Sequence, residues 1–228
     1  MSTTFRLRIR HGKTGRLRFL SHLEVARAVE RSVRRADLPF ALTQGFSVRM
    51  KVAFGPALPV GTAGTTEYVD VWLRSFVPPD EVLRRLDAST PGGLAPTAVA
   101  YVADRRPSLA SALVVSRYEV LLVGCSAVRE VRRGVEALLE TGALEVPHKG
   151  TVKRFDLGAT LLGAPEIRQV GADCVIEIGV RLGQQGSLRP EAFVRSALEY
   201  SEARASAFVV TRTALLEEHS GCLHDPLE

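Results

Sequence analysis

A short turn bounded by glycines holds the residues with the clearest chemical potential in this sequence. The run Gly12-Lys13-Thr14-Gly15-Arg16 supplies two cations and backbone N–H groups, which together can cradle a phosphate. Its spacing lacks the Gly-x-x-x-x-Gly-Lys-Ser/Thr of a P-loop, so nucleotide hydrolysis is not indicated. A tight basic turn without a ligand is the simplest alternative.

His22 follows this turn, at the start of an expected helix. An imidazole at that place can act as a general base or hold a phosphate, and Lys13 is a cation that can assist it. As a pair, His22 and Lys13 are candidate catalytic residues for RNA cleavage or modification, in the manner of ferredoxin-like endoribonucleases that use no metal. That comparison is a fold-level analogy, and a plain surface histidine is the alternative interpretation.

Other catalytic and cofactor patterns are absent from the sequence. It contains no Gly-x-Ser-x-Gly, His-Glu-x-x-His or Gly-x-Gly-x-x-Gly pattern, which disfavours the common hydrolase and dinucleotide-binding classes. His219, Cys222 and His224 are metal-ligand types, but their close spacing near the C-terminus favours chance. We therefore expect neither a metal nor a cofactor.

Composition and cysteine content indicate the compartment. Of 228 residues, 46% are hydrophobic, as in an ordinary globular protein, and the three cysteines are too scattered for a disulfide framework. The N-terminus lacks the apolar core of a signal peptide, and no apolar run approaches the ~20 residues of a membrane-spanning helix. We expect a cytoplasmic protein with no membrane contact.

Positive charge is concentrated near the N-terminus. The net charge is +5, yet residues 1–51 hold twelve Lys or Arg against three acidic residues, so the remainder of the chain is net negative. Such asymmetry indicates a polyanionic partner, and nucleic acid is the commonest one. The alternative is a solvated arginine-rich surface without a partner.

The segment 5–10 alternates apolar residues with arginines, which is the period of a strand with one face on a core. If its apolar side chains face the helices, its three arginines lie on the open face, where basic and aromatic residues of later strands can join them. Cations for phosphates beside aromatic platforms for bases make an RNA-binding surface. The alternative is that this face packs internally, with the arginines paired to acids such as Asp70. The residues expected to contact RNA are Arg6, Arg8, Arg10, Lys13, Arg16, Arg18, His22, Gln44, Arg49, Lys51, Tyr68, Trp72, Lys149, Lys153 and Arg154.

The first half of the chain predicts the order β-α-β-β-α-β. Ser21 and Glu24 form a capping-box pattern before one helix, and a proline opens the other. Alternating or β-branched runs between glycines and prolines indicate the strands. The expected elements are a strand at 5–10, a helix at 22–36, strands at 49–54 and 68–73, a helix at 79–86 and a strand at 96–102.

The second half predicts the same order again. Its expected elements are strands at 118–123, 144–147, 174–182 and 207–215, with helices at 126–140 and 190–200. We therefore predict an α+β fold of two ferredoxin-like (split βαβ) domains in tandem, each with an antiparallel sheet covered by helices on one face. The predicted divisions are a basic domain at 1–103, a linker at 104–116, a second domain at 117–218 with an insertion at 149–170, and a tail at 219–228.

Four segments carry a resemblance to a known family. They read GKTGRLRFLSHLE at 12–24, QGFS at 44–47, FGPALPVG at 54–61 and EYVD at 67–70. In these segments the chain resembles the radical-SAM-linked, or radical-SAM-associated, domain family of bacteria (DUF2344 type), whose function is unknown. The resemblance is most specific over residues 5–75.

The resemblance implies partners. Members of that family are fused to a radical S-adenosylmethionine enzyme or encoded beside one, often near an endoribonuclease of the E/G type and ribosomal-protein genes. This implies a radical SAM partner enzyme and an RNA or ribosome setting, without specifying a reaction. The chain has no Cys-x-x-x-Cys-x-x-Cys triad for an iron–sulfur cluster, so we do not expect it to be the radical enzyme itself.

Three functional hypotheses follow. The leading one is a non-catalytic accessory protein that presents RNA to a radical SAM enzyme through its basic N-terminal surface. The second is an RNA-processing or RNA-modifying enzyme that uses His22 and Lys13. The third is an adaptor whose basic face docks on an acidic protein surface.

Overall fold

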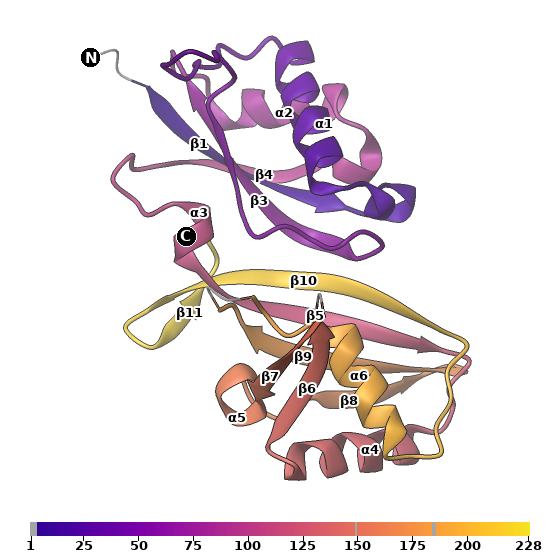
Figure 1. The fold of residues 1–228 in the computed structure, drawn as a ribbon. Helices are drawn as coiled ribbons and strands as arrows, with labels where there is room; N and C mark the ends of the chain where they lie inside the picture. Colours follow the sequence, from indigo (N-terminus) through magenta and orange to yellow (C-terminus); the bar gives the residue numbers. More distant parts are fainter. Residues whose placement is uncertain (1–3, 149, 184–185) are drawn as a thin grey trace. The chain divides into compact units, whose positions relative to one another are not determined.

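The computed structural model describes residues 4–148, 150–183 and 186–228. The chain folds as two compact units of mixed α and β structure (Figure 1). Unit 1 comprises the residues up to Leu113 together with Ala214–Glu228, and unit 2 comprises Val114–Thr213. The predicted α+β class is confirmed, and the strand pairs in both units are antiparallel.

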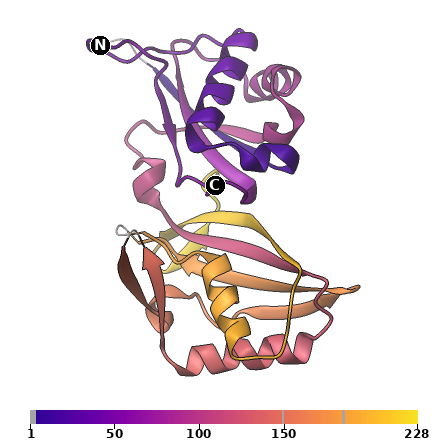
Figure 2. The ribbon, with the colours of Figure 1, turned by 45° about the vertical axis from the view of Figure 1, so that its right-hand side comes forward.

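Unit 1 has the predicted β-α-β-β-α-β order. Its strands lie in the order β4-β1-β3-β2, and each pair of neighbours is antiparallel. Figures 1 and 2 show α1 and α2 on one side of these strands, where they enclose a single apolar core. The elements are β1 (Phe5–Lys13), the 3-10 turn η1 (Gly15–Phe19), α1 (His22–Arg35), β2 (Val52–Phe54), β3 (Ala63–Leu73), α2 (Pro79–Ser89), η2 (Gly92–Leu94), β4 (Pro96–Val102) and α3 (Leu109–Ala112).

The local sequence explains why α1 begins at His22. The Ser21 side chain accepts a hydrogen bond from the Glu24 N–H, and the Glu24 carboxylate accepts one from the Ser21 N–H, which closes a capping box. Val29 and Val33 then fall on the face that packs against the sheet. The helix therefore holds its first residue at a fixed place relative to β1 and β3.

Residues 219–228, predicted to form a tail outside both domains, belong to unit 1. β10 (Ala207–His219) begins in unit 2 and ends in unit 1, where it pairs with β11 (Cys222–His224). The predicted linker at 104–116 likewise contains α3 and the first residues of β5. Short elements such as these show little periodicity, so the sequence pattern does not reveal them.

Unit 2 has a sheet with the strand order β10-β5-β9-β8, and α4 and α6 contribute to its apolar core. Gly134 allows the two helices to approach closely, since a Cβ at that position would lie 2.2 Å from the Ala197 carbonyl oxygen. The elements are β5 (Leu113–Val123), α4 (Val128–Glu140), β6 (Ala143–His148), β7 (Thr151–Asp156), α5 (Leu157–Thr160), β8 (Glu166–Val170), β9 (Asp173–Arg181) and α6 (Pro190–Glu199).

The structure also corrects the predicted insertion of unit 2 at 149–170. The expected strand at 144–147 exists within β6, but it pairs with β7 in a separate two-stranded sheet. β8, which falls inside the predicted insertion, is instead the edge strand of the main sheet beside β9. Its side chains are almost all exposed, so the inward and outward alternation that marks a strand is missing from its sequence.

Within the described ranges, no helix is both long enough and apolar enough to cross a membrane.

Candidate functional site

The strand arginines of β1 are paired with carboxylates, and two of them, Arg6 and Arg8, are buried, which corrects their predicted role on an open RNA-binding face. Arg6 and Arg8 share the carboxylate of Asp70, at 2.6 Å from Arg6 Nη2 and 2.8 Å from Arg8 Nε. Arg8 also donates to Glu217 at 2.9 Å. Burial acts to lower the pKa of Arg8, but the hydrogen bonds and charges of Asp70 and Glu217 outweigh it and raise the pKa, so the guanidinium stays charged.

The third strand arginine, Arg10, is partly exposed but also paired. Its Nη1 lies 3.2 Å from Oδ2 of Asp225, and the Tyr68 hydroxyl donates to the same oxygen at 3.0 Å. Burial, with the charge of Asp225, raises the pKa of the Tyr68 phenol. Tyr68 is only 2% exposed, so it is not available as the predicted stacking platform.

Trp72 is partly exposed and lies between two cations. The Arg6 guanidinium is 5.3 Å from the centre of its ring and the Lys51 ammonium is 4.6 Å from it. The indole N–H donates to Asp104 at 2.9 Å. Arg6, Lys51 and Trp72 therefore form a cation–π cluster within the fold, in which Arg6 is buried and Lys51 and Trp72 are partly exposed.

The remaining predicted RNA contacts are scattered. Arg16, Gln44 and Arg49 are exposed in unit 1, and the Arg18 guanidinium lies 4.8 Å from the Phe19 ring centre. Lys153 and Arg154 lie on β7 of unit 2, where Arg154 Nη1 is 3.8 Å from Glu145 Oε1. Lys149 falls outside the described residues.

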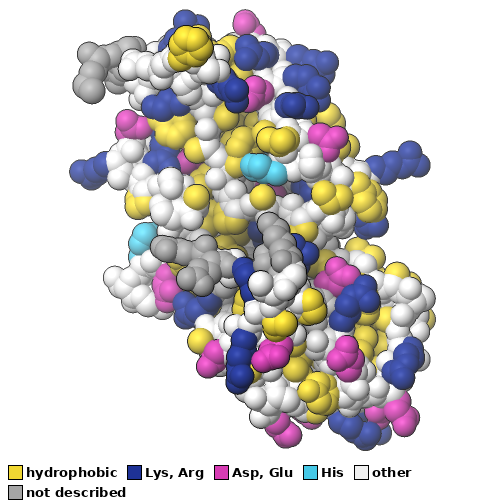
Figure 3. Space-filling model, viewed as in Figure 1, with side chains coloured by type: hydrophobic (Ala, Val, Ile, Leu, Met, Phe, Trp, Pro, Cys, Tyr) yellow, Lys and Arg dark blue, Asp and Glu magenta, His cyan; other side chains and the backbone are white. Residues whose placement is uncertain are grey.

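An exposed row of arginines on α1 was missed by the sequence interpretation. Figure 3 shows Lys and Arg side chains gathered over this helix. We name the four residues the α1 stripe. They are Arg27, Arg31, Arg34 and Arg35. Their spacing places them on the side opposite the buried valines, and none forms an ion pair with a described residue. The helical period that predicts the apolar face of α1 also predicts which of its residues point outward. The stripe could therefore have been found from the sequence.

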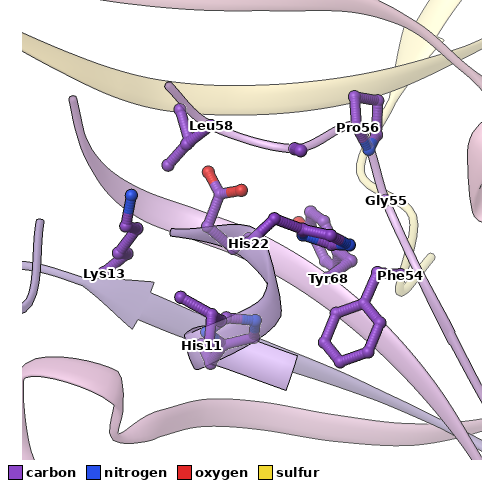
Figure 4. Close-up of a pocket in the computed structure, with 11 residues that line it drawn as sticks. His11, Lys13, His22, Phe54, Gly55, Pro56, Leu58 and Tyr68 are labelled. Atoms are coloured by element: carbon purple, nitrogen blue, oxygen red, sulfur yellow. The ribbon is translucent and has the colours of Figure 1, made fainter. Parts of the chain in front are cut away.

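A pocket lies where α1 begins, against the ends of β1 and β3 (Figure 4). Its outline encloses about 370 Å³, a volume that includes open solvent at its mouth. His11, Lys13, His22 and Glu67 are its titratable lining residues on the helix-facing side of the sheet, and Tyr68 also lines it. Its other lining residues form a mainly apolar wall: Val25, Phe54, Gly55, Pro56, Ala57 and Leu58.

The pocket begins where the inward-facing positions of β1 change from apolar to polar residues. Residues 7 and 9 of β1 are apolar and face the helices, and the same period places His11 and Lys13 on that side. Across the sheet, His11 pairs with Glu67 and Lys13 pairs with Gly64. Gly64 leaves room for the carboxylate, because a Cβ there would lie 2.4 Å from Glu67 Oε1.

Hydrogen bonds orient several of these side chains. His11 Nδ1 lies 2.8 Å from the Gly12 carbonyl oxygen, which can only accept, so this nitrogen carries the proton. The Lys13 ammonium donates to the Pro59 carbonyl at 3.3 Å. The exposed His22 ring packs edge-on against Phe54, with 5.3 Å between ring centres. The structure thus unites the predicted pair of Lys13 and His22 and adds two groups that sequence interpretation missed.

A family model described as "Uncharacterized protein conserved in bacteria (DUF2344)" matches residues 6–190. The chain belongs to this family. No curated protein matches the DUF2344 chain. Among solved structures, it is similar to a chain in "Crystal Structure of a Cbf5-Nop10-Gar1 Complex", with 12% identity and a TM-score of 0.46. The match covers 92% of the DUF2344 chain but 48% of the other, and a likeness of this size indicates nothing about function.

In this DUF2344 chain, three of the segments that carry the family resemblance meet at the pocket. The segment 12–24 provides Lys13 and His22, the segment 54–61 provides most of the apolar wall, and the segment 67–70 provides Glu67. Among the described residues, no group of three or more His, Cys, Asp or Glu is arranged to hold a metal ion. The pocket is therefore the best candidate for the site around which these segments are organised.

Proposed function

We propose that this DUF2344 chain is an accessory RNA-binding protein that contacts RNA through the α1 stripe of unit 1. The observation that carries the proposal is the exposure of four arginines on one helix face, without ion-pair partners among the described residues. Guanidinium groups suit phosphate oxygens because they offer several N–H donors and a permanent charge. Neighbouring groups along a helix are about 5–6 Å apart at Cβ, so the stripe can follow a nucleic-acid backbone.

Side chains near the start of α1 add contacts suited to unpaired bases. Phe19 is 57% exposed and Leu23 is 66% exposed, although both are large and apolar. The Arg18 guanidinium covers the Phe19 ring, and its buried Nε has no hydrogen-bond partner among the described residues. Aromatic and guanidinium planes stack on bases of any identity, which favours a single-stranded RNA over a duplex.

The accessory role is an expectation from the family resemblance. It implies a radical SAM enzyme that receives the bound RNA, and no described feature of the chain specifies that enzyme's reaction. Co-purification of the two proteins that depends on RNA would support this role. Co-purification that survives nuclease treatment would instead favour a direct protein adaptor.

The first test is RNA affinity as a function of salt. A triple variant in which Arg27, Arg31 and Arg35 become Gln should bind a short single-stranded RNA at least about tenfold more weakly at moderate salt. The slope of log affinity against log salt should fall by about 2, because each lost phosphate contact contributes roughly 0.7 on a single strand. Fluorescence anisotropy titrations at several salt concentrations measure both quantities.

The chain offers a matched control on α4. Changing Arg129, Arg132 and Arg133 to Gln removes the same charge from exposed helix positions in unit 2. This variant should keep the wild-type slope. Equal slopes for the α1 and α4 variants would show that only net charge matters, and the proposal would then be wrong.

A second candidate function, acid/base chemistry on RNA, is favoured by the meeting of Lys13 and His22 in one pocket. It predicts metal-independent cleavage or modification of RNA that is lost in His22→Ala. Incubation of end-labelled RNA with chelator present tests this directly, and unchanged RNA with every substrate tried would contradict it.

A further inference from the structure

The chain forms a short hairpin, residues 41–51, between α1 and β2. Ala41 is buried at its base, where its carbonyl accepts a hydrogen bond from the Lys51 N–H at 2.8 Å. Further out, the Thr43 N–H donates to the Arg49 carbonyl at 2.8 Å, and the Arg49 N–H donates to the Thr43 hydroxyl at 3.1 Å. These bonds fix the two arms of the hairpin and therefore the place of its tip.

The tip of this hairpin, residues 44–48, holds an aromatic ring in solvent. Phe46 is fully exposed, although phenylalanine is among the residue types most often buried. Gly45 precedes it with φ +136°, a backbone conformation that suits glycine. Leu42 and Val48 of the same hairpin are exposed too, so large apolar side chains gather here rather than being scattered. Such gathering is typical of a binding contact.

The charges around the tip suit a polyanion. No Asp or Glu occurs in residues 38–66, whereas the hairpin carries Arg49 and Lys51. The Arg49 side chain is exposed, with Nε 3.3 Å from the Ser47 hydroxyl oxygen, and it forms no ion pair with a described residue. Exposed cations without nearby carboxylates attract phosphate groups.

The size of the tip favours an unpaired base over a protein as its occupant. A stable protein interface covers about 800 Å² on each partner, which is more than one hairpin tip presents. A nucleobase needs only one ring face, and stacking on an aromatic side chain accepts any base.

The position of the hairpin suits an RNA that lies on the α1 stripe. Arg34 of the stripe has its guanidinium 4.9 Å from the ring centre of Phe40, the residue directly before the hairpin. Figure 1 shows the chain leaving the upper end of α1 and entering this segment. The hairpin therefore adjoins the C-terminal end of the stripe.

We propose that Phe46 stacks on an unpaired base of the RNA held on the α1 stripe, and that Arg49 contacts a phosphate beside that base. The inference rests on the proposed RNA-binding function and adds a base-contacting site at the C-terminal end of the stripe. It also gives a role to the segment 44–47, which carries the family resemblance but does not line the pocket.

The test uses anisotropy titrations with a single-stranded RNA of about twelve nucleotides, within the site sizes of single-strand binders. Phe46→Ala should weaken binding about tenfold and keep the wild-type slope against salt, because a stacking contact releases no counterions. Phe46→Trp should bind at least as tightly as wild type. Tyr200→Ala, which removes an exposed aromatic ring from unit 2, is the matched control and should leave the affinity unchanged.

An abasic oligonucleotide separates the base contact from the phosphate contact. Wild type and Phe46→Ala should bind it alike, whereas Arg49→Gln should weaken binding to both oligonucleotides and lower the salt slope by about 0.7. The added tryptophan of Phe46→Trp should be quenched by the RNA but not by the abasic strand, with wild type, whose one tryptophan is Trp72, as the background. Thermal unfolding checks that each variant is folded.

Two outcomes would overturn the Phe46 site alone: Phe46→Ala binding the RNA as tightly as wild type, or losing equal affinity for the RNA and the abasic strand. The α1 stripe variant separates this failure from failure of the proposed function, since it should lower the salt slope for both oligonucleotides. A wild-type slope for the stripe variant would overturn the RNA-binding proposal itself.

Discussion

Two sets of arginines in unit 1 have opposite environments. Those of β1 are held by carboxylates, with Arg8 fully buried between Asp70 and Glu217, whereas those of the α1 stripe are exposed. Both sets add to the positive charge of the N-terminal region, with three arginines on β1 and four in the stripe. The difference shows that a cluster of arginines in a sequence indicates a polyanion site only when their ion-pair partners are known. Arginines on a strand face can instead pair with carboxylates of the same chain.

The largest expected effect comes from removing the shared carboxylate. Asp70→Asn leaves Arg6 and Arg8 with one buried negative charge fewer, so the free energy of unfolding should fall by about 3–5 kcal/mol. Urea denaturation followed by circular dichroism measures it. Asp87→Asn, at an exposed position of α2, is the control and should stay within about 0.5 kcal/mol of wild type. A loss at Asp70 no larger than at Asp87 would mean that the strand arginines do not depend on this partner.

A smaller effect is expected at Glu217, because Arg8 keeps Asp70 when Glu217 is changed. Glu217→Gln should cost about 2–3 kcal/mol, as Arg8 and Arg106 each lose a charged hydrogen bond. Burial raises the pKa of Glu217, but hydrogen bonds from His219 and Arg106 and the nearby arginine charges outweigh it and hold the pKa below its ordinary value.

The sign of this pKa shift predicts a pH dependence. A carboxylate with a lowered folded-state pKa stabilises the fold above its unfolded value of about 4.5, and this stability is lost as pH falls through the folded-state pKa. The stability difference between wild type and Glu217→Gln should therefore be constant near neutral pH and shrink in acid. Urea titrations over a range of acidic pH values measure it, and a difference that grows in acid would contradict the assignment.

The smallest effect on stability is expected from the α1 stripe. Replacing Arg27, Arg31 and Arg35 by Gln should change the free energy of unfolding by no more than about 0.5 kcal/mol per residue, because these side chains are exposed and Gln is a comparable helix former. The same urea titration applies. A large loss of stability would show that the stripe is structural and would remove the contrast with the strand arginines.

Much of unit 1 was predictable because its elements are locally encoded. The capping box of Ser21 and Glu24, the period of α1 and the alternation of β1 all appear as expected. The alternation also placed the strand arginines correctly, on the face away from Leu7 and Ile9. It could not show that Glu217 and Asp225 would neutralise them, because those acids lie more than 200 residues away in the sequence.

The pocket was only half predictable. Lys13 and His22 were identified by residue type and by their place around a turn, but His11 and Glu67 were not. A signal existed for His11, since it occupies the inward position that follows Leu7 and Ile9 and is polar. Glu67 reaches the site only through the register of β3 against β1, which no local pattern specifies.

Mapping the protein residues that crosslink to a bound RNA tests the central claim most directly. With a photoreactive single-stranded RNA and identification of the crosslinked peptides, the account predicts attachment within residues 16–35, where the α1 stripe, Phe19 and His22 lie. Crosslinks confined to the sheet face that carries Arg6, Arg8 and Arg10, or to unit 2, would contradict it.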